Sequence, residues 1–401
     1  MDRLKSILAS GIFAFIIALI VYIINDGLGN DFSTCFEISA LLFFNIFIGF
    51  LAYFTVSDYF GARWSSIEIP EDIKVVKLKI DFSALASETA KNLIIQEILY
   101  DKMENDSQKE SEFALSRLRS PLDSEAVIRI EIVHLETADL RSASSDSNIV
   151  FYFHGLTDNP KKVRQTTVSL ALLGYIIIVC DLSTLKVDID ENEVTEFELS
   201  SWASENSKIL KKAAAVEKIL KMFDEEVFKE LDDTFKVHLV GESMGGLIAV
   251  RNYMNFYERP WLGKVVLISC FSNFTKIFPK WTVPLTKTWL IKWNYRIRGF
   301  KLHPHKRLNE ELSPSILLKR HREEWSKKHK RNGWENYAKR RFLLIHSKSD
   351  GVVVPENFYE NKSTLGLTDG NAILFDNGGH TQIWNELGIL GLIDGFIQNS
   401  V

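Results

Sequence analysis

Cysteine is scarce in this chain: Cys35, Cys180 and Cys270 are the only three, and no two lie near each other in sequence. Zinc sites and disulfide frameworks need closely or regularly spaced cysteines, so the sequence predicts neither. The formal net charge of −4 over 401 residues is small and favours no charged partner. Cys180 and Cys270 each end a run of strand-forming residues, and we interpret both as core residues.

Charge is missing from two long stretches near the N-terminus. Residues 7–24 and 38–56 contain no charged side chain, and each is close to the roughly 20 residues that cross a bilayer as a helix. We expect a transmembrane hairpin over residues 1–57, followed by a linker over 58–72. A signal peptide is a poorer interpretation, because the first run exceeds the usual ~7–15 apolar residues and a second run follows. A buried soluble hairpin would be unusually apolar on all sides.

The few charges around these stretches indicate an orientation. Arg3 and Lys5 precede the first run and Arg63 follows the second, whereas the segment between them carries only acidic charges. Positive-inside weighting then predicts an integral membrane protein with both ends in the cytoplasm, so that the region from residue 73 onward lies on the cytoplasmic side. Glycosylation of the sequons at Asn273 and Asn361 would indicate the inverse orientation.

From residue 73 onward, strand-like and helix-like segments alternate. Strands are expected over residues 73–80, 126–135, 148–153, 175–180, 237–240, 265–270, 342–346 and 372–375, and helices over 161–173, 202–231 and 247–254. Short loops between alternating strands and helices predict parallel βαβ units, and so an α/β fold with a mostly parallel, doubly wound sheet. Residues 93–112 are an insert to which we assign no function.

One stretch of this region carries chemistry: Gly241-Glu242-Ser243-Met244-Gly245 follows a short strand and opens a helix. A serine on such a turn is held in a strained conformation, with glycines on either side because a side chain there would collide with neighbouring elements. Ser243 is therefore a candidate nucleophile. The N–H of Met244, at the start of the helix, is available to an oxyanion.

A hydroxyl is a weak nucleophile until a base takes its proton. Asp350 follows the strand over 342–346, and His380 follows the strand over 372–375. Serine, acid and histidine in this order at strand ends are the arrangement of a Ser-His-Asp triad. Asp376 is only four residues before His380, and the strand over 265–270 is followed by no carboxylate, so Asp350 is the expected acid.

Four motifs resemble those of the α/β-hydrolase superfamily, in particular carboxylesterases, monoacylglycerol lipases and lysophospholipases: His154-Gly155-Leu156-Thr157, Gly241-Glu242-Ser243-Met244-Gly245-Gly246, Asp350-Gly351-Val352-Val353-Val354-Pro355 and Gly378-Gly379-His380. The resemblance covers residues 73–401 and implies a helical lid insertion over about 271–340. It assigns the oxyanion donors to Leu156 and Met244, gives His154 a role in shaping its loop, and implies no cofactor or metal. The chain departs from the family after residue 180, where an acidic segment over 181–198 replaces the expected glycine-rich turn.

The expected lid is strongly basic, with 18 Lys and Arg against 5 Asp and Glu, and five tryptophans are interleaved: Trp281, Trp289, Trp293, Trp325 and Trp334. Such a surface suits anionic lipid headgroups, although nucleic-acid binding and plain solvation use the same residue types. Because of the expected hairpin, we favour membrane contact and expect no nucleic-acid partner.

Together these features predict a membrane-anchored serine hydrolase, an esterase or lipase cleaving lipid acyl esters through an acyl-enzyme. A thioesterase and an S9- or S33-like serine peptidase use the same catalytic set. A catalytically idle hydrolase fold that serves as a membrane-bound interaction module is the alternative from another class.

Overall fold

The computed structural model describes the residues of one unit of the chain, Ser66–Val401. The described residues are 69–81, 127–135, 148–156, 158, 160, 163–186, 205–226, 228, 235–277, 306–329 and 333–399. The predicted membrane helices over 7–24 and 38–56, and the insert over 93–112, lie outside them. Within the described ranges, no helix is long and apolar enough to cross a bilayer.

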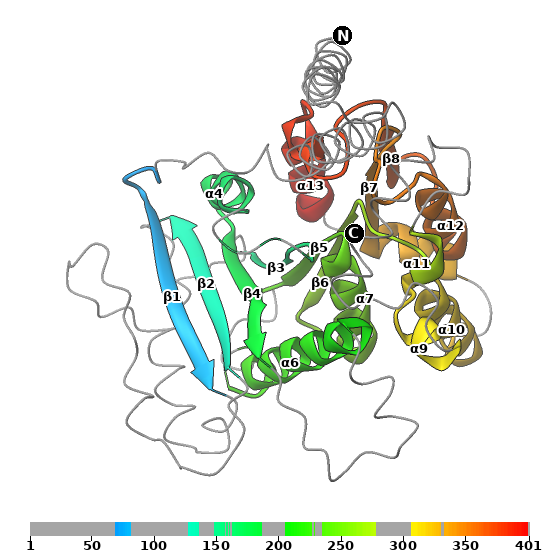
Figure 1. Ribbon diagram of the computed structural model, residues 1–401, viewed down its shortest axis with the longest axis horizontal. Helices are drawn as coiled ribbons and strands as arrows, with labels where there is room; N and C mark the ends of the chain where they lie inside the picture. Colours follow the sequence, from blue (N-terminus) through cyan, green and yellow to red (C-terminus); the bar gives the residue numbers. More distant parts are fainter. Residues whose placement is uncertain are drawn as a thin grey trace, which may run out of the picture. The chain divides into compact units, whose positions relative to one another are not determined.

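The unit is built on one eight-stranded sheet in the order β1-β2-β4-β3-β5-β6-β7-β8 (Figure 1). β1 pairs antiparallel with β2, and β2 antiparallel with β4, whereas all other neighbours are parallel. This confirms the predicted mostly parallel α/β sheet. The strands are β1 Ile73–Asp81, β2 Val127–Leu135, β3 Ile149–Phe153, β4 Ile176–Lys186, β5 Val237–Glu242, β6 Leu262–Ile268, β7 Phe342–Ser347 and β8 Ala372–Phe375.

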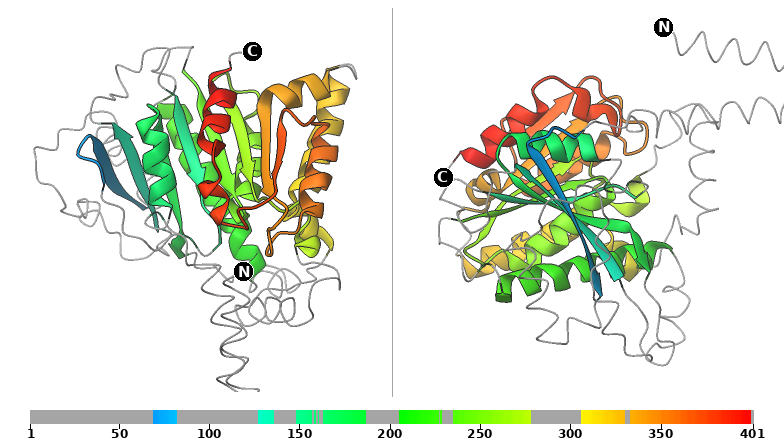
Figure 2. Two further views of the ribbon diagram at one scale, coloured as in Figure 1. Left: turned by 90° about the horizontal axis from the view of Figure 1, so that it is seen from above. Right: turned by 90° about the vertical axis from the view of Figure 1, so that its left-hand side faces the viewer.

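Helices cover both faces of this sheet (Figure 2). α4 (Arg164–Leu172) and α13 (Ile389–Gln398) pack on one face. Among the described helices, those on the other face include α6 Glu205–Glu226, α7 Met244–Phe256, α10 Pro314–Lys328, α11 Trp334–Arg341 and α12 Glu356–Leu365. The sheet therefore lies between two helical layers.

Two apolar cores result from the alternation of side chains along the central strands. On β3, Phe151 and Phe153 pack into the core beneath α6 and α7, and Val150 and Tyr152 pack into the core beneath α4 and α13. All five residues of this strand are buried. Burial on both faces explains why the central strands read as continuous apolar runs.

The structure describes part of the segment that is expected to form a lid. α9 (Lys306–Glu311), α10 and α11 lie within it, and Trp325 and Trp334 are only 8% and 3% exposed. The Trp334 indole N–H donates to the Leu365 carbonyl at the end of α12. These two tryptophans are core residues, so the expected contact with lipid headgroups does not include them. Trp281, Trp289 and Trp293 lie outside the described residues.

The acidic segment after residue 180 also begins differently. β4 continues to Lys186, and Asp181 is buried within it rather than solvated in a loop. In the pairing of β4 with β2, Asp181 lies opposite Arg129 and Lys186 lies opposite Val127. The register shifts between these two pairs. The rest of the segment lies outside the described residues.

Candidate active site

Ser243 occupies the sharp turn between β5 and α7. Its backbone angles are φ 53° and ψ −115°, which a non-glycine residue rarely adopts, and such strain costs on the order of 1–3 kcal/mol. Its N–H donates to the Ile268 carbonyl at the end of β6, and its own carbonyl accepts from Gly246. These bonds hold the turn in place and keep the Ser243 side chain only partly buried at the carboxyl edge of the sheet.

The glycines around Ser243 are required by close backbone contacts. A Cβ on Gly245 would lie 1.9 Å from the Phe153 carbonyl oxygen of β3, and one on Gly241 would lie 2.4 Å from the Gly245 carbonyl oxygen. A Cβ on Gly246 would lie 2.3 Å from the Cys270 sulfur. The motif thus lets α7 begin directly against β3 and β6.

The structure brings Ser243, His380 and Asp350 together at this edge. His380 Nε2 lies 3.0 Å from Ser243 Oγ, and His380 Nδ1 lies 2.8 Å from Asp350 Oδ2. Because an ionised carboxylate only accepts hydrogen bonds, Nδ1 carries the proton and Nε2 is left to accept from the serine. These residues come from the ends of β5, β7 and β8, although 137 positions separate Ser243 from His380.

Asp350 is prepared to remain ionised. Burial is the largest single influence and raises its pKa, but the neighbouring His380 and His346 and a backbone N–H bond outweigh it, so the net pKa lies below the ordinary value. Asp350 Oδ1 accepts from the N–H groups of Val352 (2.8 Å) and Val353 (2.9 Å). The carboxylate is therefore fixed by the turn that follows β7.

The pKa of His380 is shifted in the opposite direction to that of Asp350. Burial lowers its pKa, but the negative charge of Asp350 and the hydrogen bond to it, followed by the charges of Glu242 and Asp158, raise the pKa above its ordinary value. These three carboxyl groups thus influence the environment in which an imidazolium would form.

Serine side chains hold the segment that carries His380. Ser269, itself at φ 48°, donates from Oγ to the His380 carbonyl at 3.1 Å. Ser347 donates to the Asn377 carbonyl, and Ser349 accepts from the Gly379 N–H at 3.0 Å. The ends of β6 and β7 therefore restrain the histidine loop.

His154 is a structural residue of the loop after β3. It is fully buried, Nε2 accepts the N–H of Leu182 at 3.0 Å, and Nδ1 donates to the Gly155 carbonyl. Burial is the largest influence on its pKa and lowers it, so the ring stays neutral. His154 thereby fastens its loop to β4.

The same loop lies against Ser243. A Cβ on Gly155 would be 3.6 Å from Ser243 Cβ and 2.9 Å from an Asp158 carboxylate oxygen. Leu156 is the next residue, and Met244 is the first residue of α7, whose N–H has no partner within the helix. Both predicted oxyanion donors therefore belong to segments that border the serine.

Sequence reasoning missed Glu242 and His346 at this site. Glu242 is fully buried and accepts from Tyr152 and Trp384, and His346 lies 3.7 Å from Asp350. The position of Glu242, inside the turn motif and next to the nucleophile, was the one available signal. Its partners are distant in sequence and could not be foreseen.

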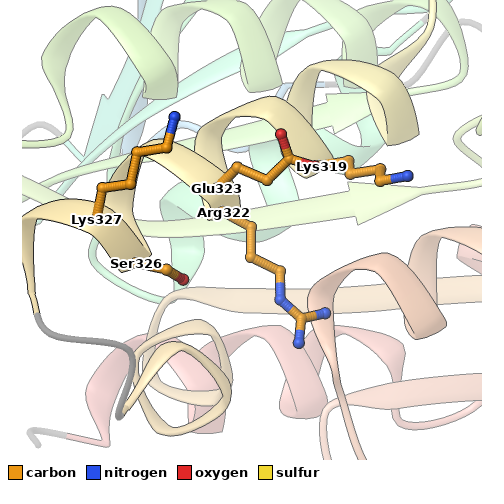
Figure 3. A pocket seen from close by; sticks show the side chains of 5 residues that line it. All are labelled: Lys319, Arg322, Glu323, Ser326 and Lys327. Atoms are coloured by element: carbon orange, nitrogen blue, oxygen red, sulfur yellow. The ribbon is translucent and has the colours of Figure 1, made fainter.

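A separate hollow of about 470 Å³ lies along α10 and is lined by Lys319, Arg322, Glu323, Ser326 and Lys327 (Figure 3). Arg322 donates from this hollow to the Thr364 carbonyl. None of the site residues predicted from the sequence lines it. Within the described part of the chain, no group of three or more His, Cys, Asp or Glu residues is placed to hold a metal ion.

No protein-family model and no curated protein matches the sequence. Several solved structures are similar to the chain. Carboxyl esterase 2 from the fungus Tuber melanosporum has 14% identity and a TM-score of 0.44, covering 83% of this chain and 86% of that one. A 2-hydroxy-6-oxo-6-phenylhexa-2,4-dienoate hydrolase from Rhodococcus sp. has 13% identity and a TM-score of 0.40, covering 68% and 94%. TT1662 from Thermus thermophilus has 12% identity and a TM-score of 0.43, covering 68% and 95%.

The strand order, the antiparallel start of the sheet and the strained serine between β5 and α7 define an α/β-hydrolase type of fold. Because every one of these TM-scores is below 0.5, function has to be inferred from the chain's own site.

Proposed function

We propose that this chain is a serine hydrolase that cleaves carboxylic acyl esters. One observation carries the proposal: a strained, partly exposed Ser243 is hydrogen-bonded to His380, which is hydrogen-bonded to a buried Asp350. A neutral imidazole with Nε2 facing the hydroxyl is the base that a serine nucleophile needs.

In the proposed reaction, Ser243 Oγ attacks the ester carbonyl while His380 Nε2 takes its proton. Asp350 keeps the proton of His380 on Nδ1 and stabilises the imidazolium. The N–H groups of Leu156 and Met244 bind the oxyanion, and each such donor is worth about 10²–10³ in rate. His380 then protonates the leaving alcohol, which leaves an acyl-enzyme on Ser243. A water molecule gives a proton to His380 and attacks the acyl carbonyl, and His380 returns that proton to Ser243 Oγ as the acid leaves.

The lipid character of the substrate and the membrane location remain proposals based on the sequence. Two uncharged stretches over 7–24 and 38–56 would place the domain at a bilayer surface. An enzyme held there meets monoacylglycerols, lysophospholipids and other long-chain esters at high local concentration. The remaining basic, tryptophan-containing part of the expected lid, over 278–305, would contact anionic headgroups.

Labelling with a fluorophosphonate probe tests whether the serine is reactive. Full-length protein in detergent should be labelled at Ser243, and Ser243→Ala should lose the label. Ser363→Ala is the matched control, because Ser363 is exposed on α12 and does not stand on the strained turn between β5 and α7. A folded protein that resists labelling would favour the idle interaction module.

Turnover of an acyl-chain series tests the substrate class. Long-chain monoacyl esters in mixed micelles should be hydrolysed faster than short soluble esters, thioesters and peptide amides. Faster turnover of thioesters or peptides would instead assign a thioesterase or a peptidase, because the triad alone does not separate these reactions.

A further inference from the structure

Glu242 is a buried carboxylate directly beside the candidate nucleophile. Its exposed fraction is 0%, and Oε2 accepts two hydrogen bonds, from Tyr152 Oη at 2.6 Å and from Trp384 Nε1 at 3.1 Å. Burying a charge is costly unless hydrogen bonds compensate it. Two donors converging on one oxygen favour the ionised form of this carboxyl group.

The partners of Glu242 connect two parts of the site. Tyr152 belongs to β3, the strand that leads into the loop of Leu156. Trp384 belongs to the 3-10 helix Gln382–Asn385, which begins two residues after His380. The rings of Tyr152 and Trp384 also pack together, with centroids 6.1 Å apart. Glu242 therefore ties the nucleophile turn to the segment that carries the candidate base.

We propose that Glu242 is a positioning residue that holds His380 against Ser243 and stabilises, through its negative charge, the imidazolium formed when the serine gives up its proton. This inference rests on the proposed serine hydrolase function. Glu242 occupies the position directly before the nucleophile in the turn motif, where the Ser-His-Asp mechanism itself requires no particular residue.

The charges that face His380 decide the expected pH effect. Among the described residues they include Asp350, Glu242, Asp158 and, when protonated, His346. Asp350 acts through direct contact, whereas Glu242 acts through proximity and through its bond to Trp384. Removing the Glu242 charge should therefore lower the pKa of His380 and weaken the stabilisation of the imidazolium in the transition state.

The test is the pH dependence of the second-order rate constant for fluorophosphonate labelling of Ser243. Glu242→Gln keeps the side-chain shape and an oxygen acceptor but removes the charge. Its acid limb should move to lower pH by roughly half a unit or more, and its plateau rate should fall about threefold to tenfold. Trp384→Phe keeps a ring but removes the N–H donor, so its plateau should fall while its acid limb moves less than that of Glu242→Gln.

Matched controls separate positioning from general stability. Tyr253→Phe is the control for Tyr152→Phe. It removes a buried tyrosine hydroxyl that donates to Tyr337 at 2.8 Å, whereas Tyr152→Phe removes the hydroxyl that donates to Glu242. Trp261→Phe is the control for Trp384→Phe. It removes an indole N–H that donates to the Asp224 carboxylate at 2.5 Å, whereas Trp384→Phe removes the N–H that donates to Glu242. Both controls should lower the melting temperature and leave the pH profile at its wild-type position.

The outcomes distinguish this inference from the proposed function. An unlabelled wild-type protein refutes the hydrolase itself. A labelled wild type whose acid limb and plateau are unchanged in Glu242→Gln refutes only the role of Glu242. If Glu242→Gln does not fold, Tyr152→Phe and Trp384→Phe decide, and wild-type plateau rates in both would overturn the proposal.

Discussion

His380 is the residue whose protonation should control the reaction. The imidazole must be neutral to accept the serine proton, and the Asp350 charge raises its pKa above the ordinary 6.5 despite burial. Activity should therefore rise with pH through a midpoint above 6.5. The pH dependence of kcat/KM measures this midpoint, since it reports the ionisation of the free enzyme. A midpoint below 6.5 would contradict the arrangement.

Asp350→Asn tests the origin of this shift. An amide carries no charge and can donate to Nδ1, which then favours a proton on Nε2, the wrong tautomer for accepting from Ser243. We expect kcat to fall by about 10⁴ and the remaining activity to titrate at lower pH. Asp376→Asn is the control: Asp376 is 77% exposed and pairs with Lys348, so its replacement should leave activity unchanged.

His238 should make the fold sensitive to acid. It is buried on β5, its Nδ1 accepts the Lys264 N–H at 2.9 Å, and among described atoms its Nε2 has no partner. Burial, followed by the charges of Lys264, Arg341 and Lys236, lowers its pKa from 6.5 to about 3. Since the unfolded chain then binds a proton that the folded chain excludes, stability is lost as pH falls from 6.5 toward 3.

His238→Asn keeps a side-chain acceptor and removes the titration. Below pH 6.5 the free energy of unfolding of this variant should fall less steeply than that of the wild type, by about 1.4 kcal/mol per pH unit. Denaturant unfolding of the full-length protein in detergent, followed by tryptophan fluorescence between pH 5 and 7.5, measures the difference. Equal slopes would show that His238 is already charged in the folded state.

The turn between β5 and α7 is the element on which the site depends, and its glycines are not equivalent. A methyl group at position 245 meets the Phe153 carbonyl of the β3 backbone, whereas one at position 246 meets the side chain of Cys270. A backbone oxygen cannot move without displacing the strand. Gly245→Ala should therefore destabilise the protein by several kcal/mol or prevent folding.

Gly246→Ala should also be destabilising, but Cys270→Ala should rescue part of the loss by removing the sulfur at 2.3 Å. The same Cys270→Ala change should not rescue Gly245→Ala. Melting temperatures of the three single and two double variants, compared with the wild type, measure this difference as two double-mutant cycles. Equal rescue of both glycine variants would contradict the assigned contacts.

Local pattern was sufficient to predict the elements that build the site. Continuous apolar runs located β3, β5 and β7, and the turn motif located Ser243, because burial on both faces and a steric demand for glycine leave marks in neighbouring residues. The hydrogen bonds of Ser269 to His380 and of Glu242 to Trp384 produce no recognisable pattern in the neighbouring sequence. Each joins residues more than 100 positions apart, and only the folded sheet brings them together.

The basic segment 306–341 shows where composition misleads. Its lysines and arginines suggested a surface cover, yet α10 buries Leu317, Leu318, His321 and Trp325 on its inner side. Trp325 stacks on Tyr337 and on His329 within this layer. An amphipathic helix presents its charges outward while its aromatic residues complete the core, so charge counts alone do not identify a membrane surface.

The orientation of the whole chain is open to a direct test, but the sequon at Asn361 is a poor reporter of it. Asn361 is only 1% exposed and donates to the Cys270 carbonyl, and the Asn273 side chain accepts from the Thr275 N–H. The folded domain would shield Asn361 from glycosylation whichever side it faces. Thiol accessibility is a better measurement, because Cys180 and Cys270 are buried.

Cys35 lies between the two uncharged stretches, so a hairpin with both ends in the cytoplasm puts it on the opposite side of the membrane from the catalytic domain. A membrane-impermeant maleimide applied to sealed cells should label the wild type. Cys35→Ser should abolish the label, and adding Asp369→Cys, at a side chain that is 96% exposed, should restore it only after permeabilisation. The reverse pattern would invert the orientation. Labelling of both positions in sealed cells would place them on one side, which a single hairpin does not allow.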